Sequence, residues 1–573
     1  MCVLSFSQEH DAGAAIVEKG KILAAINEER LTRVKGQSGF PFKSIAEVLR
    51  LSGKSARDVK HVIVPEISKF VDVVKNVSKY PFTAFPVGKG GKTSVLDVLR
   101  HFIYSTYIIL QTYPRVIIQH FLDVRRLRQM FPRAQFHRVE HHVCHAASAF
   151  HTSGYDKALI ITSDYWGDFV CNMVAVGEGK SIKVVARTWY PNSLGHYYAN
   201  LTAWLGFRPN RHEGKILGLA AFGNANSPAY DEVKDLIKVD GLQMYCPYMI
   251  GKMWHKKFPF FKKSLMRRLQ ETYSREDISA VFQRRFEEAF VDLAKNAYAK
   301  FKIENLVLAG GTFSNVKLNQ RLFEIPGMKR IFIFPNMTDG GISAGAALHY
   351  DISTNGSLGS ALDHVYFGPE YSNAEIEEAL KRENVQYEYV ENIEARMAQL
   401  LADNKVVARF NGKMEYGPRA LGNRSILYAA TDPTVNDWLN KRLKRTEFMP
   451  FAPVTMAEFA EKCYKNLHGA EYPAKFMTIT FDCTDYMKQA SPATVHVDGT
   501  ARPQLIDEKT NPSYYRVLKE YHKITGIPTL VNTSFNMHEE PIVCSPEDAI
   551  RSYQCGHLGY LAIGNFLVGN SED

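Results

Sequence analysis

Residues 2 to 27, CVLSFSQEHDAGAAIVEKGKILAAIN, contain three short runs of β-forming residues separated by two polar turns. The runs are CVLSF, AAIV and KILAAIN, and the turns SQEHDAG and EKG carry the glycine and charged residues that favour chain reversal. This order of strands and turns predicts a β-hairpin arrangement at the start of the chain.

A related pattern returns at residues 158 to 186. There ALIITS, the turn DYWGD, FVCNMVAV, the turn GEGK and SIKVVA follow one another. Two copies of one pattern in a single chain indicate a duplicated α/β unit. Between the copies, residues 66 to 137 are apolar and basic with few turn signals, so we expect a mostly helical insertion there.

Two glycine turns follow predicted strands farther along the chain. NLVLAGGTFSN (305 to 315) contains Gly310 and Gly311, and IFIFPNMTDGGISAGAALHY (331 to 350) contains Asp339 before a helix of small residues. Glycine allows backbone N–H groups to approach a phosphate closely, although tight turns need glycine anyway. In a duplicated α/β frame, these turns favour nucleotide binding.

Domain boundaries are indicated by a change of composition after residue 350, where Ser, Gly and Asn become frequent. We predict a first domain at residues 1–355, a linker at 356–375 and a second α/β domain at 376–573.

Composition and cysteine usage are those of an ordinary globular protein. Of the 573 residues, 45% are hydrophobic and 23% are charged. The start lacks a basic segment followed by a long apolar stretch, and the apolar residues 101 to 121 include His, Gln, Pro and Arg, which favours a buried helix pair over a membrane span. The eight cysteines lack CxxC spacing, so we expect reduced thiols, no structural zinc and a cytoplasmic location.

The formal net charge is +10, and residues 252 to 270, KMWHKKFPFFKKSLMRRLQ, concentrate Lys and Arg with interleaved aromatic residues. Such a stretch attracts nucleic acid, a membrane surface or an anionic substrate. A solvated amphipathic surface explains it equally simply.

The stretch HHVCHAASAF, residues 141 to 150, places His141 and His145 four positions apart. On a helix this spacing puts both rings on one face, where they can hold one ion, while His142 points elsewhere. Asp164 and Asp339 follow predicted strands and offer carboxylates, a set that suits iron, zinc or manganese. A pair of histidines that only caps or packs a helix is the alternative.

The C-terminal region places cations beside proline and glycine. The segments are NGKMEYGPRALGNRSIL (411 to 427), KRLKRTEFMPFAP (441 to 453), VDGTARPQ (497 to 504) and TLVNTSFN (529 to 536). The planar guanidinium of Arg matches phosphate oxygens, so these cations could converge on an anion, although single exposed arginines are usually only solvated. The candidates are Arg419, Arg424, Lys444, Arg445 and Arg502.

Six motifs in chain order carry a family resemblance. They are HDAGAAIVEKGKILAAINEERLTRVKGQSGFP, VEHHVCHAASAF, GGTFSNVKLN, MEYGPRALGNRSI, EFMPFAP and NTSFN. With these motifs the chain resembles the two-domain O-carbamoyltransferases of antibiotic tailoring and nodulation-factor synthesis. The resemblance implies an α/β fold with a duplicated actin-like (ASKHA) ATPase-type N-terminal domain and a YrdC-like C-terminal domain.

The resemblance also implies a two-stage reaction. The C-terminal domain would make carbamoyl adenylate from ATP and carbamoyl phosphate, and the N-terminal domain would move the carbamoyl group to a hydroxyl of a small-molecule natural product. The implied metal ligands are His141, His145 and Asp339, with iron as the first choice among divalent metals. The implied nucleotide turn contains Gly310, Gly311 and Asn315. The implied adenylate-forming site contains Arg419, Lys444, Arg502, Ser534 and Asn536, with Arg424 and Arg445 as neighbours.

Two features leave alternatives open within this scheme. The acceptor hydroxyl must lose a proton, and either His10 in the first turn or Asp164 is a candidate base, although His10 could simply be structural. Many relatives read RPFAP where this chain has Met449 in MPFAP. Either Lys444 or Arg445 supplies the missing cation, or anion binding is altered.

Two other functions compete with small-molecule carbamoylation. One is threonylcarbamoylation of tRNA, with residues 252 to 270 as the RNA contact. The other is an actin-like nucleotide-binding regulator without transfer chemistry. We expect a small-molecule hydroxyl acceptor, no membrane and no nucleic acid, and leave open both a homo-oligomer and the identity of the acceptor.

Overall fold

The computed structural model describes residues 2–65, 123, 125–190, 192–246, 261–444 and 449–569. Most of the predicted insertion at 66–137, the apolar stretch 101–121, the first part of the basic stretch 252–270 and Arg445 lie outside the described residues. The chain forms two compact units, one of Met1–Ser7, Ile16–Lys21 and Lys54–Ala361, the other of Gln8–Ala15, Ile22–Gly53 and Leu362–Asp573. The boundaries expected from composition stay predictions.

The first sheet contains the three strands predicted from residues 2 to 27. They are β1 (Cys2–Ser7), β2 (Gly13–Glu18) and β3 (Lys21–Asn27), and the sheet order is β3-β2-β1-β4-β5 with β4 (Val59–Val64) and β5 (Gln135–Arg138). Strands β1, β4 and β5 run parallel. The helical prediction is therefore wrong for residues 135–137, because these residues form a parallel ladder with β4 from His61 to Val64.

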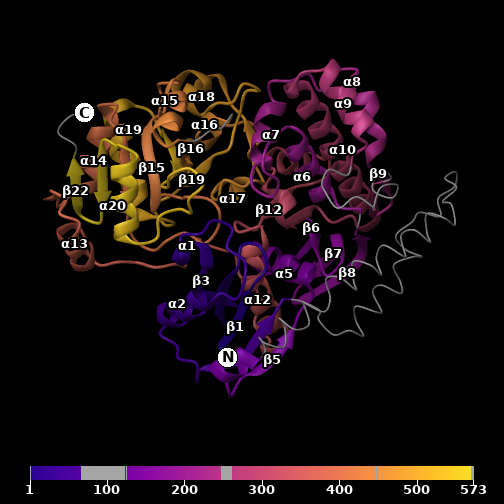
Figure 1. Cartoon of the computed structure of the whole chain (residues 1–573), viewed down its shortest axis with the longest axis horizontal. Helices are drawn as coiled ribbons and strands as arrows, with labels where there is room; N and C mark the ends of the chain where they lie inside the picture. The colour runs from indigo at the N-terminus through magenta and orange to yellow at the C-terminus, as the bar shows by residue number, and fades with distance from the viewer. Residues whose placement is uncertain are drawn as a thin grey trace. The chain divides into compact units, whose positions relative to one another are not determined.

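The second sheet repeats this strand order. Its order is β12-β11-β6-β7-β8, so a central first strand again has a hairpin partner on one side and parallel strands on the other. Figure 1 shows β6, β7 and β8 side by side. The strands are β6 (Lys157–Gly167), β7 (Val170–Glu178), β8 (Ser181–Trp189), β11 (Asn305–Ala309) and β12 (Arg330–Ile333). The predicted α/β class is confirmed, and the two copies seen in the sequence correspond to two sheets of one topology.

Two helices rich in small residues pack together in the first unit. Figure 1 shows α5 (His141–Ser153) beside α12 (Ile342–Asn355). A Cβ built on Gly345 of α12 would lie 1.9 Å from the Cys144 carbonyl oxygen of α5, so glycine permits this close approach. Helix α12 ends at Gly356, whose φ of 74° is left-handed.

The remaining elements of the first unit form a mostly helical layer after β8. Tyr197 of α6 packs on Phe282 and Phe286 of the long helix α10, with ring centroids 5.4 and 6.4 Å away. The elements are α6 (Leu194–Trp204), α7 (Glu213–Ala220), α8 (Ala229–Val233), β9 (Lys238–Asp240), β10 (Gln243–Tyr245), α9 (Lys263–Thr272), α10 (Arg275–Phe301) and α11 (Val316–Phe323).

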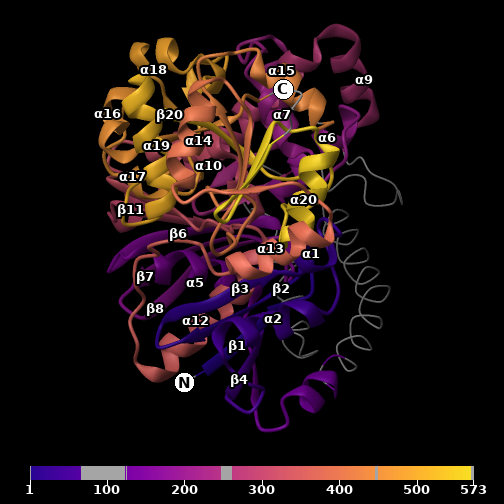
Figure 2. The same cartoon turned by 90° about the vertical axis from the view of Figure 1, so that its left-hand side faces the viewer.

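The second unit is built on an eight-stranded mixed sheet of order β13-β22-β21-β14-β15-β20-β16-β19. Figures 1 and 2 show α14 beside α19 over this sheet. The strands are β13 (Glu388–Tyr389), β14 (Val407–Phe410), β15 (Arg424–Ala429), β16 (Ala452–Met456), β19 (Gln504–Ile506), β20 (Thr529–Ser534), β21 (Tyr560–Ile563) and β22 (Phe566–Gly569), with a separate pair β17 (Phe481–Asp482) and β18 (Thr500–Ala501). The helices are α1 (Glu28–Thr32), α2 (Phe42–Ser52), α13 (Asn373–Arg382), α14 (Ile393–Ala402), α15 (Val435–Arg442), α16 (Ala460–Cys463), α17 (Glu471–Ala474), α18 (Asp485–Ala490), α19 (Pro512–Thr525) and α20 (Pro546–Cys555).

Neither a disulfide bond nor a helix that could span a membrane is present in the described residues. All eight cysteines lie in described residues, and no disulfide joins them. No helix in the described part of the chain is both long and apolar enough to span a membrane.

Candidate metal centre

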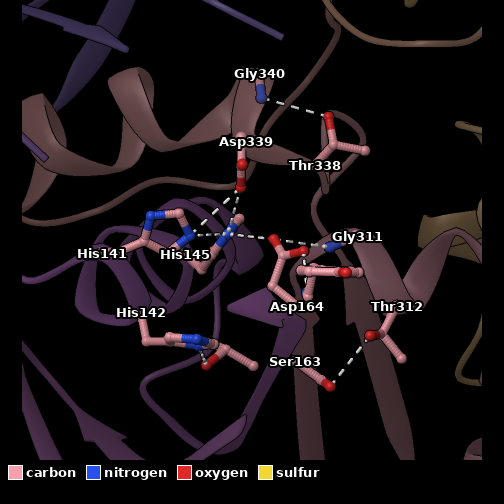
Figure 3. A network of polar contacts seen from close by, with 12 residues as sticks. His141, His142, His145, Ser163, Asp164, Gly311, Thr312, Thr338, Asp339 and Gly340 are labelled. Atoms are coloured by element: carbon pink, nitrogen blue, oxygen red, sulfur yellow. Dashed lines mark hydrogen bonds and ion pairs between the residues drawn. The ribbon is translucent and has the colours of Figure 1, made fainter. Parts of the chain in front are cut away.

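Four side chains converge at one point of the first unit, two from α5, one from β6 and one from the 3-10 turn Asp339–Gly341 that follows β12. Figure 3 shows His141, His145, Asp164 and Asp339 pointing toward one another. The two Nε2 atoms of the histidines are 3.1 Å apart. Asp339 Oδ1 lies 3.3 Å from His141 Nε2 and 3.4 Å from His145 Nε2, and Asp164 Oδ2 lies 3.1 Å from His145 Nε2. All four ligand atoms fall within 4.8 Å of one another.

This donor set fits a first-row divalent ion. Such an ion sits about 2.0 to 2.2 Å from imidazole nitrogen and carboxylate oxygen, which separates neighbouring ligand atoms by about 3 to 3.5 Å. Burial by itself raises the pKa of Asp339, but the charges and hydrogen bonds of His141 and His145 lower it by more, so the carboxylate stays ionised. Both histidines are fully buried while Asp164 and Asp339 keep 13% and 16% of their side chains exposed, so the centre opens on its carboxylate side.

His142 lies outside the cluster, as the helical spacing predicts. Its Nε2 lies 2.9 Å from the Val170 carbonyl oxygen, which can only accept, so Nε2 donates and Nδ1 accepts from the Thr162 hydroxyl at 2.8 Å. Burial, and then the charges of His141 and His145, lower the pKa of His142 well below its ordinary value. In Figure 3 its ring points away from the other two histidines, and its role is to tie α5 to the second sheet.

The β6–β7 turn positions the start of α5. Asp168 Oδ2 accepts a hydrogen bond of 2.8 Å from the His141 backbone N–H, which caps the helix from 27 residues away. Gly167 allows the His141 ring to approach, because a Cβ there would lie 2.2 Å from a ring carbon. No local sequence signal indicates this cap, because Asp168 comes next to His141 only through the β6–β7 hairpin.

The first predicted glycine turn surrounds Asp164. The Gly311 N–H donates to Asp164 Oδ2 at 3.3 Å, and the Tyr165 N–H donates to Oδ1 at 2.6 Å. Gly310 has a φ of 107°, and a Cβ there would lie 2.1 Å from the Ser163 carbonyl oxygen. Asn315 caps α11 through the Leu318 N–H at 3.0 Å. The turn predicted to hold a nucleotide is therefore hydrogen-bonded directly to the Asp164 carboxylate of the candidate metal centre.

These residues meet because of strand order. Strands β12, β11 and β6 are neighbours and run parallel, so their carboxyl ends lie at one edge of the sheet. The β6–β11 ladder ends at Thr162 and Ala309, just before Asp164 and Gly310. Asp339 follows β12 on the 3-10 turn Asp339–Gly341, where Thr338 Oγ1 accepts from the Gly340 N–H at 3.3 Å. Ligand sites at the carboxyl ends of parallel strands are the rule in α/β sheets.

In the second unit, the predicted cation-rich loop is organised by a buried glutamate. Glu415 Oε1 accepts from the backbone N–H groups of Leu421, Asn423 and Arg424 at 2.7, 2.9 and 3.2 Å. Buried side chains hold the loop carbonyls as well, since Asn532 donates to Ala420 and Gln504 to Leu421. The backbone of the loop that carries Arg419 is therefore hydrogen-bonded on both its N–H and its carbonyl groups. Sequence reasoning missed Glu415, whose only local signal is its position within the glycine- and proline-rich segment.

Arg424 stabilises the fold of this loop. Its guanidinium is fully buried, stacks 3.7 Å from the Phe410 ring centroid, and donates to carbonyl oxygens of Pro369, Asn411, Gly412 and Asn423. These contacts hold the guanidinium within the loop, and the predicted place of Arg424 beside an adenylate stays a prediction.

The other predicted residues of the second unit lie on different loops and strands. Arg419 and Arg502 are half-buried, Lys444 is exposed with a left-handed φ of 58°, and Met449 is half-buried. Ser534 ends β20 opposite Ser425, and the Asn536 amide donates to Met537 and Glu540 carbonyls at 2.7 and 3.1 Å. His10, in the turn after β1, keeps 48% of its side chain exposed, with Nδ1 3.2 Å from Asp11 Oδ1.

The mixed sheets and the His–Asp cluster define an α/β protein with a candidate metal centre. Two family models match the chain, carbamoyltransferase N-terminus over residues 1–348 and carbamoyltransferase C-terminus over residues 398–570. The chain therefore belongs to the carbamoyltransferase family, and the family predicted from its motifs is confirmed.

Relatives match along nearly the whole chain. An uncharacterized protein of Methanocaldococcus jannaschii is 31% identical over 98% of this chain and 98% of its own length. An uncharacterized protein of Synechocystis is 33% identical over 98% and 95%. The nodulation protein NolNO of Sinorhizobium fredii is 29% identical over 98% of this chain and 79% of its own. Among solved structures, HypF of T. kodakarensis covers 62% of this chain and 48% of its own, with 13% identity and a TM-score of 0.34, too low to carry an argument.

Proposed function

We propose that this carbamoyltransferase is an ATP-dependent O-carbamoyltransferase that forms carbamoyl adenylate from carbamoyl phosphate and ATP, and then carbamoylates a hydroxyl of a small-molecule natural product. The observation that carries the proposal is the match of both halves of the chain to the N- and C-terminal models of one family. The finer description, an actin-like N-terminal domain and a YrdC-like C-terminal domain in a cytoplasmic enzyme, belongs to the same proposal.

In the first stage, fixed donors and cations of the second unit would bind anionic substrates. Carbamoyl phosphate and the departing pyrophosphate carry negative charge that preorganised cations stabilise. Glu415 holds the loop of Arg419 in place, and Lys444, Arg502, Ser534 and Asn536 complete the proposed set. Arg424 contributes by stabilising the loop from within the protein.

In the second stage, residues of the first unit would position the carbamoyl group. His141, His145, Asp164 and Asp339 would hold a divalent metal, iron by preference, and when bound this ion supplies Lewis-acid polarisation of a carbonyl. Gly310 and Gly311 would approach the nucleotide phosphates with backbone N–H groups.

The candidate base for the acceptor proton in this proposal is either Asp164 or His10. The Asp164 carboxylate contacts His145 and two backbone N–H groups, and the imidazole of His10, which is 48% exposed, pairs with Asp11. The acceptor oxygen loses its proton to that base and forms a bond to the carbamoyl carbon, and AMP leaves with the electrons of the broken carbon–oxygen bond.

The decisive experiment incubates the protein with ATP, carbamoyl phosphate and a panel of hydroxylated natural products, and uses mass spectrometry to find a gain of one carbamoyl group. Arg502→Ala should abolish carbamoyl-phosphate-dependent ATP turnover with the metal content unchanged, and Arg396→Ala, an exposed arginine of α14, is the matched control. ATP binding without consumption of carbamoyl phosphate by the native protein would contradict the proposal.

A further inference from the structure

Three polar aromatic side chains meet at the outer edge of the first sheet, outside the candidate metal centre. They are His61 of β4, His137 of β5 and Tyr350 of α12, named here the His–His–Tyr cluster. His61 Nδ1 lies 3.0 Å from His137 Nε2 and 3.0 Å from the Tyr350 hydroxyl oxygen. The ring centroids of His137 and Tyr350 are 4.3 Å apart. One nitrogen, that of His61, is therefore shared by the other two polar groups.

The strand ladder and α12 bring these side chains together. Strand β5 is the last strand in the order of its sheet, and His137 lies opposite Ile63 in the parallel ladder with β4. Because residues two apart in a strand lie on one face, His61 and Ile63 share a face of the sheet with His137. Helix α12 packs against β1 and β4 of this sheet (Figure 1) and places Tyr350 on that face. No local motif reveals the cluster, since His61 is 76 residues from His137 and 289 from Tyr350 in the chain.

Hydrogen bonding alone leaves the His–His–Tyr cluster incomplete. In a neutral imidazole, each ring nitrogen carries either one hydrogen or one lone pair. His61 Nδ1 can therefore donate one hydrogen bond or accept one, yet two polar atoms lie 3.0 Å from it. One hydrogen bond shared between two partners makes poor use of these groups. A cation between the three atoms uses a lone pair of each.

The protonation states of the cluster suit a metal ion. Burial, and then the charge of His137, lower the pKa of His61, and burial lowers the pKa of His137. Both imidazoles are therefore neutral at pH 7, which is the form that binds metal. Burial raises the pKa of the Tyr350 phenol, so ligation by its phenolate releases one proton to solvent.

We propose that the His–His–Tyr cluster is a second metal site, which takes a late first-row divalent ion, zinc or copper. Imidazole nitrogen suits both ions. Neighbouring ligand atoms of such an ion lie about 3 to 3.5 Å apart, which agrees with the two distances at His61 Nδ1. All three side chains are partly exposed, so water can complete the ligand shell, and the site binds its ion more weakly than the buried centre.

The second ion would connect the two segments that carry ligands of the candidate metal centre. Strand β5 ends at Arg138, just before α5 begins at His141, and α12 begins at Ile342, just after Asp339. Tyr350 lies eight positions beyond Ile342, roughly 12 Å along the helix axis, so one ion cannot serve both sites. The role of the second ion is structural, because it fastens α12 to the edge strand of the first sheet.

Zinc titration of the full-length protein counts the sites. The protein is stripped of metal with a chelator, gel-filtered, and titrated with zinc alone by calorimetry. The native protein should bind two equivalents, and His137→Phe, which keeps an aromatic ring, should bind one because the second site loses at least about 100-fold in affinity. His145→Ala should also bind one equivalent, and the double variant none. His468→Phe removes a fully exposed imidazole of the second unit and is the matched control, with two equivalents expected.

Copper and thermal unfolding report on the ligands and on the structural role. In the His145→Ala protein, Tyr350→Phe should remove the phenolate-to-copper charge-transfer absorption and the proton released on binding, and should weaken zinc binding by more than about 10-fold. Zinc should raise the melting temperature of His145→Ala and leave that of the double variant with His137→Phe unchanged.

Two results would overturn the inference. One is equal zinc stoichiometry in the native protein and His137→Phe. The other is a single equivalent in the native protein that His145→Ala abolishes. Either result would reduce the His–His–Tyr cluster to a hydrogen-bonded group of packed rings. Charge-transfer absorption that persists in Tyr350→Phe would contradict the phenolate as a ligand.

Discussion

Alanine at His142 and alanine at His145, both on α5, should have opposite effects on helix stability and metal binding. His142→Ala leaves the Thr162 hydroxyl and the Val170 carbonyl buried without their imidazole partner. Each orphaned buried group costs about 1 to 3 kcal/mol, so the local stability of α5 should fall by about 2 to 6 kcal/mol. His145→Ala removes a nitrogen that faces three other ligand atoms, and should eliminate most metal binding.

Two measurements separate these effects. Metal content is determined by elemental analysis of folded, gel-filtered protein, and hydrogen exchange of α5 amides is followed after removal of metal, so that metal binding adds no stability. His142→Ala should accelerate exchange at least 30-fold and retain the metal, whereas His145→Ala should lose the metal and exchange nearly as slowly as the native apoprotein. If His145→Ala keeps its full metal content, or if His142→Ala alone loses it, the assignment of ligand and structural roles is refuted.

Three further changes test other parts of the structure. Burial, with a smaller contribution from His349, lowers the pKa of His151 to about 3. Because an unfolded chain binds this proton from pH 6.5 downward, the folded protein loses stability between pH 6.5 and 3. His151→Leu should therefore reduce the slope of unfolding free energy against pH by up to about 1.4 kcal/mol per pH unit in acid unfolding measurements. Gly167→Ala should displace the His141 ring and weaken metal affinity by about 10 to 100-fold in competition with a chelator. Glu415→Ala should loosen the Arg419 loop and raise KM for carbamoyl phosphate with the metal content unchanged, and an unchanged KM would contradict the positioning role of Glu415.

Local sequence patterns predicted those parts of the fold that depend on local interactions. The strands β1, β2 and β3 and the helix of His141 and His145 follow directly from β-forming runs, turn residues and a four-residue spacing. Strand β5 was missed because Gln135–Arg138 has no alternating apolar pattern and becomes a strand only through its ladder with β4. The helix prediction there was based on composition, and composition carries no information about strand pairing between segments about 70 residues apart.

The roles of charged residues were harder to predict than their presence. Arg424 and Arg419 share one short segment, yet the guanidinium of Arg424 is buried among carbonyl oxygens while Arg419 is half-buried on the loop. In the sequence, Arg419 and Arg424 are both cations near glycine. Their different burial cannot be predicted from it, because that burial arises from the tertiary packing of β14, β15 and the loop. Glu415 and Asp168 were missed for the same reason, since each acts on backbone groups that the fold brings to it.

The duplication explains why two different residues compete for the role of base. The turn after β1, which contains His10, and the hairpin after Ser163, which contains Asp164, occupy corresponding places in two sheets of the same strand order. In the second copy Asp164 joins a cluster that could hold a metal ion, because the parallel strands β11 and β12 bring a glycine turn and Asp339 to the same edge. The carboxylate of Asp164 lies 3.1 Å from His145 Nε2 and accepts hydrogen bonds from the backbone N–H groups of Tyr165 and Gly311. The corresponding turn of the first sheet carries an imidazole, that of His10, which is 48% exposed, so the two copies differ in the ionisable group that follows their central strand.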